Sequence, residues 1–196
     1  YRFTYPASGD ASLLIDLAHS VPLLAGIVNS ESGISASDVV LHAELDADGW
    51  PMFSGSGVYA GGFGGAHGLH FYAVVKKRPK VMGTYDADGL HDGSNGFARD
   101  TLRSKEESVG GFLRFETAEN EDVYVKIGIS FTGIEKAKMW LEKEIPAWDY
   151  DAVRDETMAL WETELQKIRI SGDHVTEIDK MKHYTAIYHA MCMPRD

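Results

Sequence analysis

The sequence is poor in cysteine and in positive charge. Only Cys192 occurs among 196 residues, so no disulfide can form within the chain, and the cysteine content does not identify a redox compartment. Cys192 lies in an apolar run, AIYHAMCM, which predicts a buried side chain rather than a nucleophile. Lys and Arg number 19 against 30 Asp and Glu, a formal net charge of −11. Because this charge repels phosphate groups, we expect no nucleic acid and no anionic membrane as a partner.

A membrane-spanning run and a targeting segment are also missing. Apolar residues make up 44% of the chain and charged residues 25%, which is typical of a globular domain. Tyr1 comes first, without an initiator Met, a basic region or an apolar signal core. We therefore expect that any targeting signal has been removed or lies upstream.

Residues 1–132 have the pattern of an antiparallel β-sandwich. Val123, Val125 and Ile127 alternate with Tyr124 and Lys126, as expected for a strand with one buried face. Turn-forming segments such as DADG separate the runs and read as ordinary turns rather than calcium loops. The predicted strands cover residues 1–5, 12–18, 38–45, 69–75, 80–85, 111–117 and 123–131.

After Gly133 the apolar period changes from two to about 3.6, which predicts helices. The first helix should cover residues 134–144 and end before Pro146. Asp149 or Asp151 can cap a second helix, and a third is predicted to begin near Asp173. The apolar side of these helices is expected to lie against protein outside this chain.

The stretch between Gly55 and Gly68 is rich in glycine. It lacks the GK[ST] ending of a phosphate-binding loop and precedes a strand rather than a helix, so we interpret it as a flexible or ligand-facing loop. Tyr59 or Phe63 in this loop could stack on a sugar, although nothing in the sequence specifically supports that role.

Histidines nearby give a weak indication of a metal site. His67 and His70 are three residues apart, with His91 and Asp92 further along. Residues three apart on a strand point to opposite faces, so the pair could share an ion only across a bend. We predict no metal ligands here.

Paired carboxyl groups, which glycoside hydrolysis requires, are not identifiable from the sequence. Glu142 and Glu144 look solvated, and the acids between residues 149 and 155 suit helix starts. We assign no catalytic residue. The helical part contains Trp140, Trp148 and Trp161, two of them at helical core positions, and burial is the favoured interpretation rather than a carbohydrate platform.

Ordered motifs at residues 128–189 resemble the exo-α-mannosidases of glycoside hydrolase family 92. These motifs are Gly128-Ile129-Ser130, then Glu144-Ile145-Pro146, Trp148-Asp149-Tyr150, Trp161 and Tyr184-Thr185-Ala186-Ile187-Tyr188-His189. The opening YRFTYP and the following LLIDLAHS also resemble a strand pair of the family's N-terminal domain. Ala66 departs from the family pattern, which has Trp there, so a substrate role of this loop is in doubt.

The resemblance implies a calcium-dependent, inverting enzyme with a galactose-mutarotase-like β-sandwich, linker helices and an (α/α)6 barrel. Residues 1–132 would be the later part of the sandwich, 133–172 the linker helices, and 173–196 the first barrel helix. The acid, the base and most of the calcium shell would lie beyond Asp196. The expected partners are α-mannoside glycans and the remaining domain of the same enzyme, in a secreted or periplasmic location.

The leading hypothesis is therefore a non-catalytic piece of an α-mannosidase, inactive by itself. A carbohydrate-binding or interaction module is the alternative, followed by a purely structural domain. His189 and Arg195 are candidates for contact with substrate or barrel, with structural packing as the other interpretation.

Overall fold

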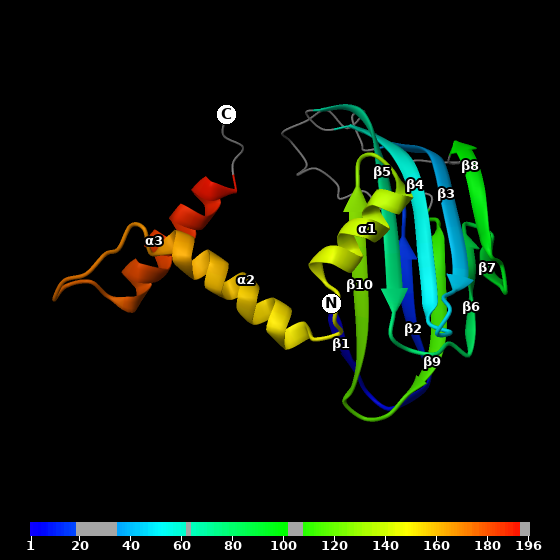
Figure 1. Ribbon diagram of the computed structural model, residues 1–196, viewed down its shortest axis with the longest axis horizontal. Coiled ribbons are helices and arrows are strands. Elements are labelled where there is room, and N and C mark those ends of the chain that lie inside the picture. The colour runs from blue at the N-terminus through cyan, green and yellow to red at the C-terminus, as the bar shows by residue number, and fades with distance from the viewer. Residues whose placement is uncertain (19–34, 62–63, 102–107, 193–196) are drawn as a thin grey trace. The chain divides into compact units, whose positions relative to one another are not determined.

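The computed structural model describes residues 1–18, 35–61, 64–101 and 108–192. Contacts within the chain divide it into two units, Tyr1–Trp148 and Asp149–Asp196. The first unit contains the strands and helix α1, and the second contains helices α2 and α3 (Figure 1). Each unit is described by itself below.

The larger of two antiparallel sheets has six strands in the order β1-β10-β5-β4-β3-β8 (Figure 1). Short strand β1 covers only the first half of β10, from Arg2 opposite Tyr124 to Tyr5 opposite Glu121. The strands are β1 (Arg2–Tyr5), β3 (Ser35–Leu45), β4 (Pro51–Gly61), β5 (Gly64–Val75), β8 (Gly96–Thr101) and β10 (Glu121–Ser130).

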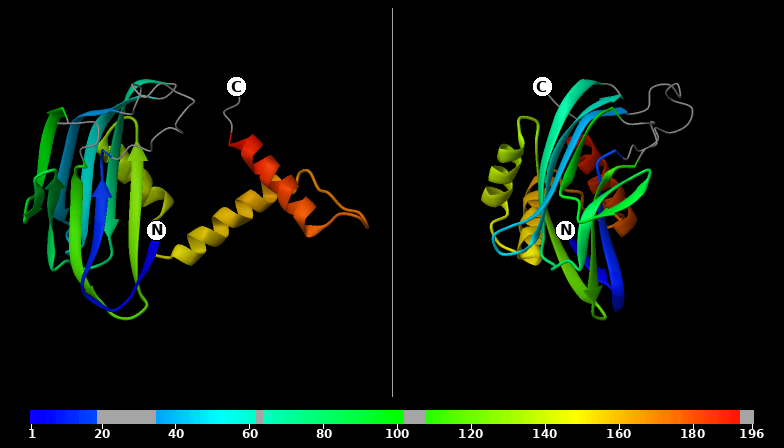
Figure 2. Two further views of the ribbon diagram at one scale, coloured as in Figure 1. Left: turned by 180° about the vertical axis from the view of Figure 1, so that it is seen from behind. Right: turned by 90° about the vertical axis from the view of Figure 1, so that its right-hand side faces the viewer.

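The second sheet has four strands in the order β2-β9-β6-β7. Figure 2 shows the two sheets as separate layers. Side chains from both sheets form one core, in which Phe53 and Val123 of the larger sheet meet Leu113 and Phe115 of the smaller one. The strands are β2 (Ser8–Asp16), β6 (Val81–Asp86), β7 (Gly89–Asp92) and β9 (Gly110–Thr117). The predicted antiparallel β-sandwich followed by helices is confirmed.

The glycine-rich stretch is not a loop, so this prediction was wrong for its described residues. Its described residues lie in β4 and β5, which pair from Met52 opposite Val74 to Tyr59 opposite His67, with a register shift before Gly61 opposite Gly64. Gly55 shows the physical reason, because a Cβ there would stand 2.2 Å from the carbonyl oxygen of Val40. Glycine thus permits close strand packing here rather than mobility.

Helix α1 (Ile134–Glu144) has the predicted bounds and packs on the face of the larger sheet opposite the core. Its buried residues Ala137 and Leu141 contact Tyr72 of β5. Gly128 of β10 makes this approach possible, because a Cβ there would lie 2.4 Å from the carbonyl oxygen of Ala137. Residues 133–148 are therefore integrated with the sandwich.

The second unit consists of two helices with side-chain caps. Asp149 accepts a hydrogen bond from the backbone N–H of Ala152 and so begins α2 (Tyr150–Leu165), as predicted. Helix α3 (Glu177–Met191) begins later than the predicted Asp173. Its cap is Thr176, which exchanges hydrogen bonds with Asp179 in a capping box, so the start near Asp173 was wrong.

The predicted DADG turns are confirmed. Asp46 accepts hydrogen bonds from the backbone N–H groups of Asp48 and Trp50, and Asp86 accepts one from Asp88. Such Asp-centred turns satisfy local backbone donors.

Candidate functional site

Three aromatic rings gather where α2 and α3 meet. The rings of Trp161 and Tyr188 lie 4.8 Å apart between centroids, and those of Tyr188 and His189 lie 5.8 Å apart. Trp161 is half-buried, whereas His189 is exposed. We call Trp161, Tyr188 and His189 the aromatic cluster. It combines apolar ring faces with polar edges, a composition suited to contact with a sugar or with another protein surface.

One predicted candidate, His189, is thus part of the aromatic cluster, while Arg195 lies outside the described residues.

The thiol of Cys192, hydrogen-bonded to Tyr188, raises the pKa of the tyrosine hydroxyl. Cys192 is exposed, so the prediction of a buried cysteine was wrong. The reason is its position at the end of α3, where the helix has no covering neighbour among the described residues. The role of His189 stays a prediction.

Around the aromatic cluster, the second unit exposes large apolar side chains. Neither α2 nor α3 contains a buried residue in the described part of the chain. Leu160 is 65% exposed and Met181 is 66% exposed. The predicted uncovered apolar surface is therefore present. The larger exposed side chains are Met158, Leu160, Ile168, Ile178, Met181, Tyr188 and Met191.

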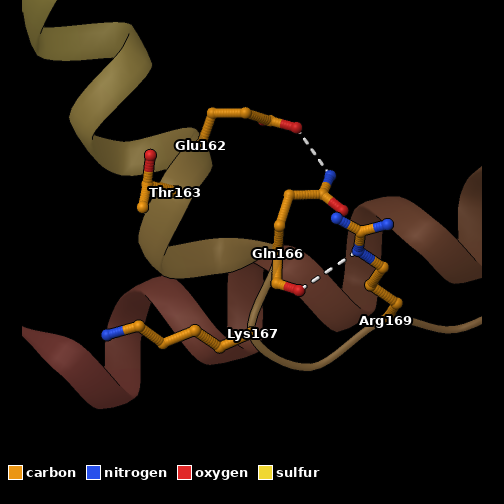
Figure 3. A pocket seen from close by; sticks show the side chains of 5 residues that line it. All are labelled: Glu162, Thr163, Gln166, Lys167 and Arg169. Atoms are coloured by element: carbon orange, nitrogen blue, oxygen red, sulfur yellow. Dashed lines mark hydrogen bonds between the residues drawn. The ribbon is translucent and has the colours of Figure 1, made fainter.

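A shallow, polar depression lies at the end of α2 (Figure 3). The Nε2 of Gln166 donates to Glu162 over 2.6 Å, and the Nε of Arg169 donates to the Gln166 carbonyl over 3.2 Å. Lys167 is paired with Glu164. Glu162 is the single carboxyl group among its lining residues, so this depression has no pair of acids for hydrolysis.

A second hollow, of about 320 Å³, lies in the first unit between β10 and α1. Its lining includes Ile127, Gly128, Ile129, Trp140, Glu144 and Ile145. We call it the edge groove. Glu144 is again the single carboxyl group among the lining residues. The groove therefore suits an apolar partner rather than acid–base chemistry.

Several carboxyl groups have shifted pKa values, and each of these shifts is downward. Hydrogen bonds from His91, Lys80, Lys77 and Thr176 lower the pKa of the carboxyl groups listed here: Asp86, Glu116, Glu121 and Asp179. A glycosidase general acid needs a raised pKa, so these four are unsuited to that role. Within the described residues no group of three or more His, Cys, Asp or Glu could hold a metal ion.

The helical tryptophans are less buried than predicted. Trp140 is 42% exposed and lies under the ammonium group of Lys143, while Trp148 and Trp161 are half-buried. The prediction of core burial was therefore wrong for Trp140.

Tyr59 donates its hydroxyl hydrogen to the carbonyl oxygen of Leu17 over 2.8 Å, which gives this residue a structural contact. Phe63 lies outside the described residues.

Ile127 and Ile129 are surface residues, which sequence reasoning did not predict. Both lie on the same face of β10 as the buried Val123 and Val125, yet Ile129 is 62% exposed. The alternation of these residues alone predicts that they are buried. Their exposure also depends on how far the neighbouring strand extends, which the alternation does not show.

None of the described helices is both long and apolar enough to cross a membrane.

Comparisons with known proteins define the class. Residues 1–130 match the Glycosyl hydrolase family 92 N-terminal domain, and residues 136–196 match the Glycosyl hydrolase family 92 catalytic domain. The sandwich and the helices are thus parts of a glycoside hydrolase. The chain belongs to glycoside hydrolase family 92, as its motifs suggested.

Individual relatives agree with this assignment. An uncharacterized secreted glycosidase of Arthroderma benhamiae is 32% identical over 92 residues, which cover 45% of this chain and 12% of the relative. A family 92 α-mannosidase of Bacteroides thetaiotaomicron, also solved with mannoimidazole, is 24% identical with a TM-score of 0.72. The match covers 96% of this chain and 23% of that chain.

An inverting family 92 mannosidase of the same bacterium shares the fold at lower similarity. It is 14% identical with a TM-score of 0.55, and the match covers 83% of this chain and 25% of that chain. The chain thus spans about a quarter or less of the length of these relatives.

Proposed function

We propose that this chain is part of a calcium-dependent, inverting exo-α-mannosidase that removes terminal α-mannosides from glycans. One observation carries the proposal: both domains of family 92 match, in order, along a single chain. The structural relatives support mannosides as the substrate class, because they include mannosidases and a complex with mannoimidazole. The mannosidase named as inverting supports the stereochemical assignment.

In this proposal, the described residues support the reaction without performing it. Inversion requires an acid and a base about 6.5–9.5 Å apart, so that a water molecule fits beside the sugar. The hollows described above each have a single carboxyl group in their linings. The acid and the base are therefore assigned to other parts of the intact enzyme, and isolated residues 1–196 should not hydrolyse mannosides.

Calcium is proposed for the intact enzyme alone. Calcium needs six to eight oxygen ligands. We propose that most of these ligands lie outside this chain. We assign it no step involving the residues described here.

His189 and Arg195 are proposed to contact the substrate or the adjoining barrel. His189 is exposed within the aromatic cluster, and its ring lies close to that of Tyr188. The uncovered apolar side chains beside it suit the remaining domain of the same enzyme as their partner. A secreted or periplasmic location is proposed, and the relative named as a secreted glycosidase supports export.

A carbohydrate-binding module without catalysis is the second candidate function. The exposed Trp140 favours it, because an accessible indole can stack on a sugar. Lys143 lies 4.8 Å from the centroid of that ring and competes for one of its faces. Under this alternative, the 196-residue chain alone should bind mannose or mannobiose, and Trp140→Ala should abolish binding.

The decisive experiment uses the full-length protein with defined α-mannobioses. We expect mannose release that stops with a chelator and returns with calcium, and β-mannose as the first product seen by proton NMR. Initial release of α-mannose would contradict inversion, and full activity after chelation would contradict calcium dependence. Absence of hydrolysis, together with mannobiose binding by the 196-residue chain, would favour the binding module.

A further inference from the structure

The corner between strands β7 and β8 contains the dipeptide Asn95-Gly96 (Figure 1). Asn95 is exposed and belongs to neither strand. Its carbonyl oxygen accepts a hydrogen bond of 2.9 Å from the backbone N–H of Ala43, which holds the corner against β3. Among the described residues, no hydrogen bond holds the side-chain amide of Asn95. This side chain can therefore turn towards the backbone that follows it.

Glycine is required at position 96 by the packing of β8 on β3. The φ angle of Gly96 is +146°, a conformation that residues with a side chain rarely adopt. A Cβ there would stand 2.1 Å from the carbonyl oxygen of Leu41. The fold thus keeps a glycine directly after Asn95, and no side chain at position 96 shields the peptide group between them.

The N–H of Gly96 lies outside the hydrogen-bond ladder between β8 and β3. In a trans peptide unit the carbonyl and the N–H point in opposite directions. Because the carbonyl of Asn95 points towards β3, the N–H of Gly96 points away from it. The Oγ of Ser94 accepts from this N–H at 3.5 Å, which is long for a hydrogen bond. The nitrogen is therefore held only weakly.

We propose that Asn95 is a site of spontaneous deamidation in the folded protein. The nitrogen of Gly96 forms a bond to the Cγ of Asn95, and the side-chain NH2 group leaves as ammonia with the proton of the Gly96 N–H. Water then opens either C–N bond of the resulting cyclic imide. One product has aspartate at position 95, and the other has isoaspartate, in which the main chain runs through the former side chain.

Isoaspartate at this corner changes the pairing of β8 with β3. It adds one carbon atom to the main chain, so the carbonyl oxygen that binds the Ala43 N–H loses its register. The amide of Ala43 should therefore exchange with solvent at least about threefold faster in aged protein than in fresh protein. Aged Asn95→Gln protein should keep the exchange rate of fresh protein, and equal acceleration in this variant would contradict the assignment to residue 95.

The main test incubates the full-length protein in mildly alkaline buffer and analyses tryptic peptides by mass spectrometry. Peptide 81–99 contains Asn95 as its single amide side chain, so the mass increase from NH2 to OH identifies the site. Isomerisation of the Asp-Gly pairs in this peptide leaves the mass unchanged. Peptide 115–126 reports in the same way on Asn120, which is also exposed but precedes Glu121. Asn95 should convert at least about tenfold faster than Asn120, because glycine has no side chain to obstruct the attacking nitrogen.

Two further comparisons separate the fold from the dipeptide alone. Asn95→Gln should lose the mass increase in peptide 81–99 over the same period. Protein unfolded in urea gives the rate of the unconstrained chain, and the folded protein should react within about tenfold of that rate. Equal conversion of Asn95 and Asn120 would overturn the proposal. A folded protein that reacts more slowly than this limit would also overturn it, because the fold or the adjoining domain would then protect Asn95.

Discussion

The ammonium group of Lys126 lies 2.6 Å from the carbonyl oxygen of Ile145 and 4.5 Å from the centroid of the Trp148 ring. Lys76 approaches the same ring at 5.7 Å. Burial, and then the charge of Lys76, lower the pKa of Lys126. This lysine thus connects strand β10 to the segment that follows α1.

Replacement of Lys126 by Met should destabilise the first unit by about 1–3 kcal/mol. The variant keeps the apolar stem of the side chain but loses a charged hydrogen bond and a cation–π contact. Urea unfolding of the full-length protein, monitored by fluorescence, measures the change. Lys136→Met, on the exposed side of α1, is the control and should stay within about 0.5 kcal/mol of wild type.

Replacement of Gly128 by Val should lower stability by about 1–3 kcal/mol or more through overpacking. A Cβ at this position would stand 2.4 Å from the carbonyl oxygen of Ala137 and 2.9 Å from the Cβ of Leu141. Helix α1 must therefore move away from the sheet. Gly9→Ala is the control, because a Cβ at Gly9 meets nothing within 4 Å. Equal unfolding midpoints for the two variants would contradict the close packing.

Tyr85 should make the sandwich unstable in strong alkali. Its side chain is 7% exposed, and burial raises the pKa of its hydroxyl from 10.0 to about 12. Between pH 10 and pH 12 the Tyr85 hydroxyl loses its proton more readily in the unfolded chain than in the folded chain. The contribution of Tyr85 to folding stability is therefore full below pH 10 and falls as the pH rises towards 12. The shift corresponds to about 3 kcal/mol.

Tyr85→Phe should remove this part of the pH dependence, while Tyr124→Phe should retain it. Urea unfolding at several pH values between 9 and 12 measures the slopes. A wild-type slope in Tyr85→Phe would show that other groups cause the alkaline loss of stability.

Local patterns predicted the elements whose surroundings agree with their sequence. Strand β10 alternates regularly, and α1 carries Ala137 and Leu141 at helical spacing, so both were found with nearly correct bounds. Strand β4 was missed because Gly55 weakens the strand pattern. The need for that glycine comes from Val40, which is 15 residues away in the chain and adjacent only in the folded sheet.

Surface exposure was harder to predict than secondary structure. Burial was predicted for Trp140 because its side chain is large and apolar, but residue type does not show whether another element covers that part of the helix. The start of α3 is different, because the sequence Thr176-Glu177-Ile178-Asp179 contains its capping box. A capping rule applied there would have moved the predicted start from Asp173 to Glu177.

His189 offers a test of how the helices contribute to activity. We expect His189→Ala in the full-length enzyme to reduce kcat/KM for α-mannobiose by about tenfold or more, equivalent to about 1.4 kcal/mol. The reason is the loss of a polar ring edge from the exposed side of the aromatic cluster. His174→Ala is a matched control, because His174 is also exposed but lies ahead of α3.

The pattern of the kinetic change distinguishes two roles for His189. Contact with the substrate should raise KM with little change in unfolding temperature, and Gln at position 189 should restore part of the affinity because it can still form a hydrogen bond. Packing against the adjoining domain should lower the unfolding temperature without a selective change in KM. Wild-type kinetics and stability in His189→Ala would refute both roles.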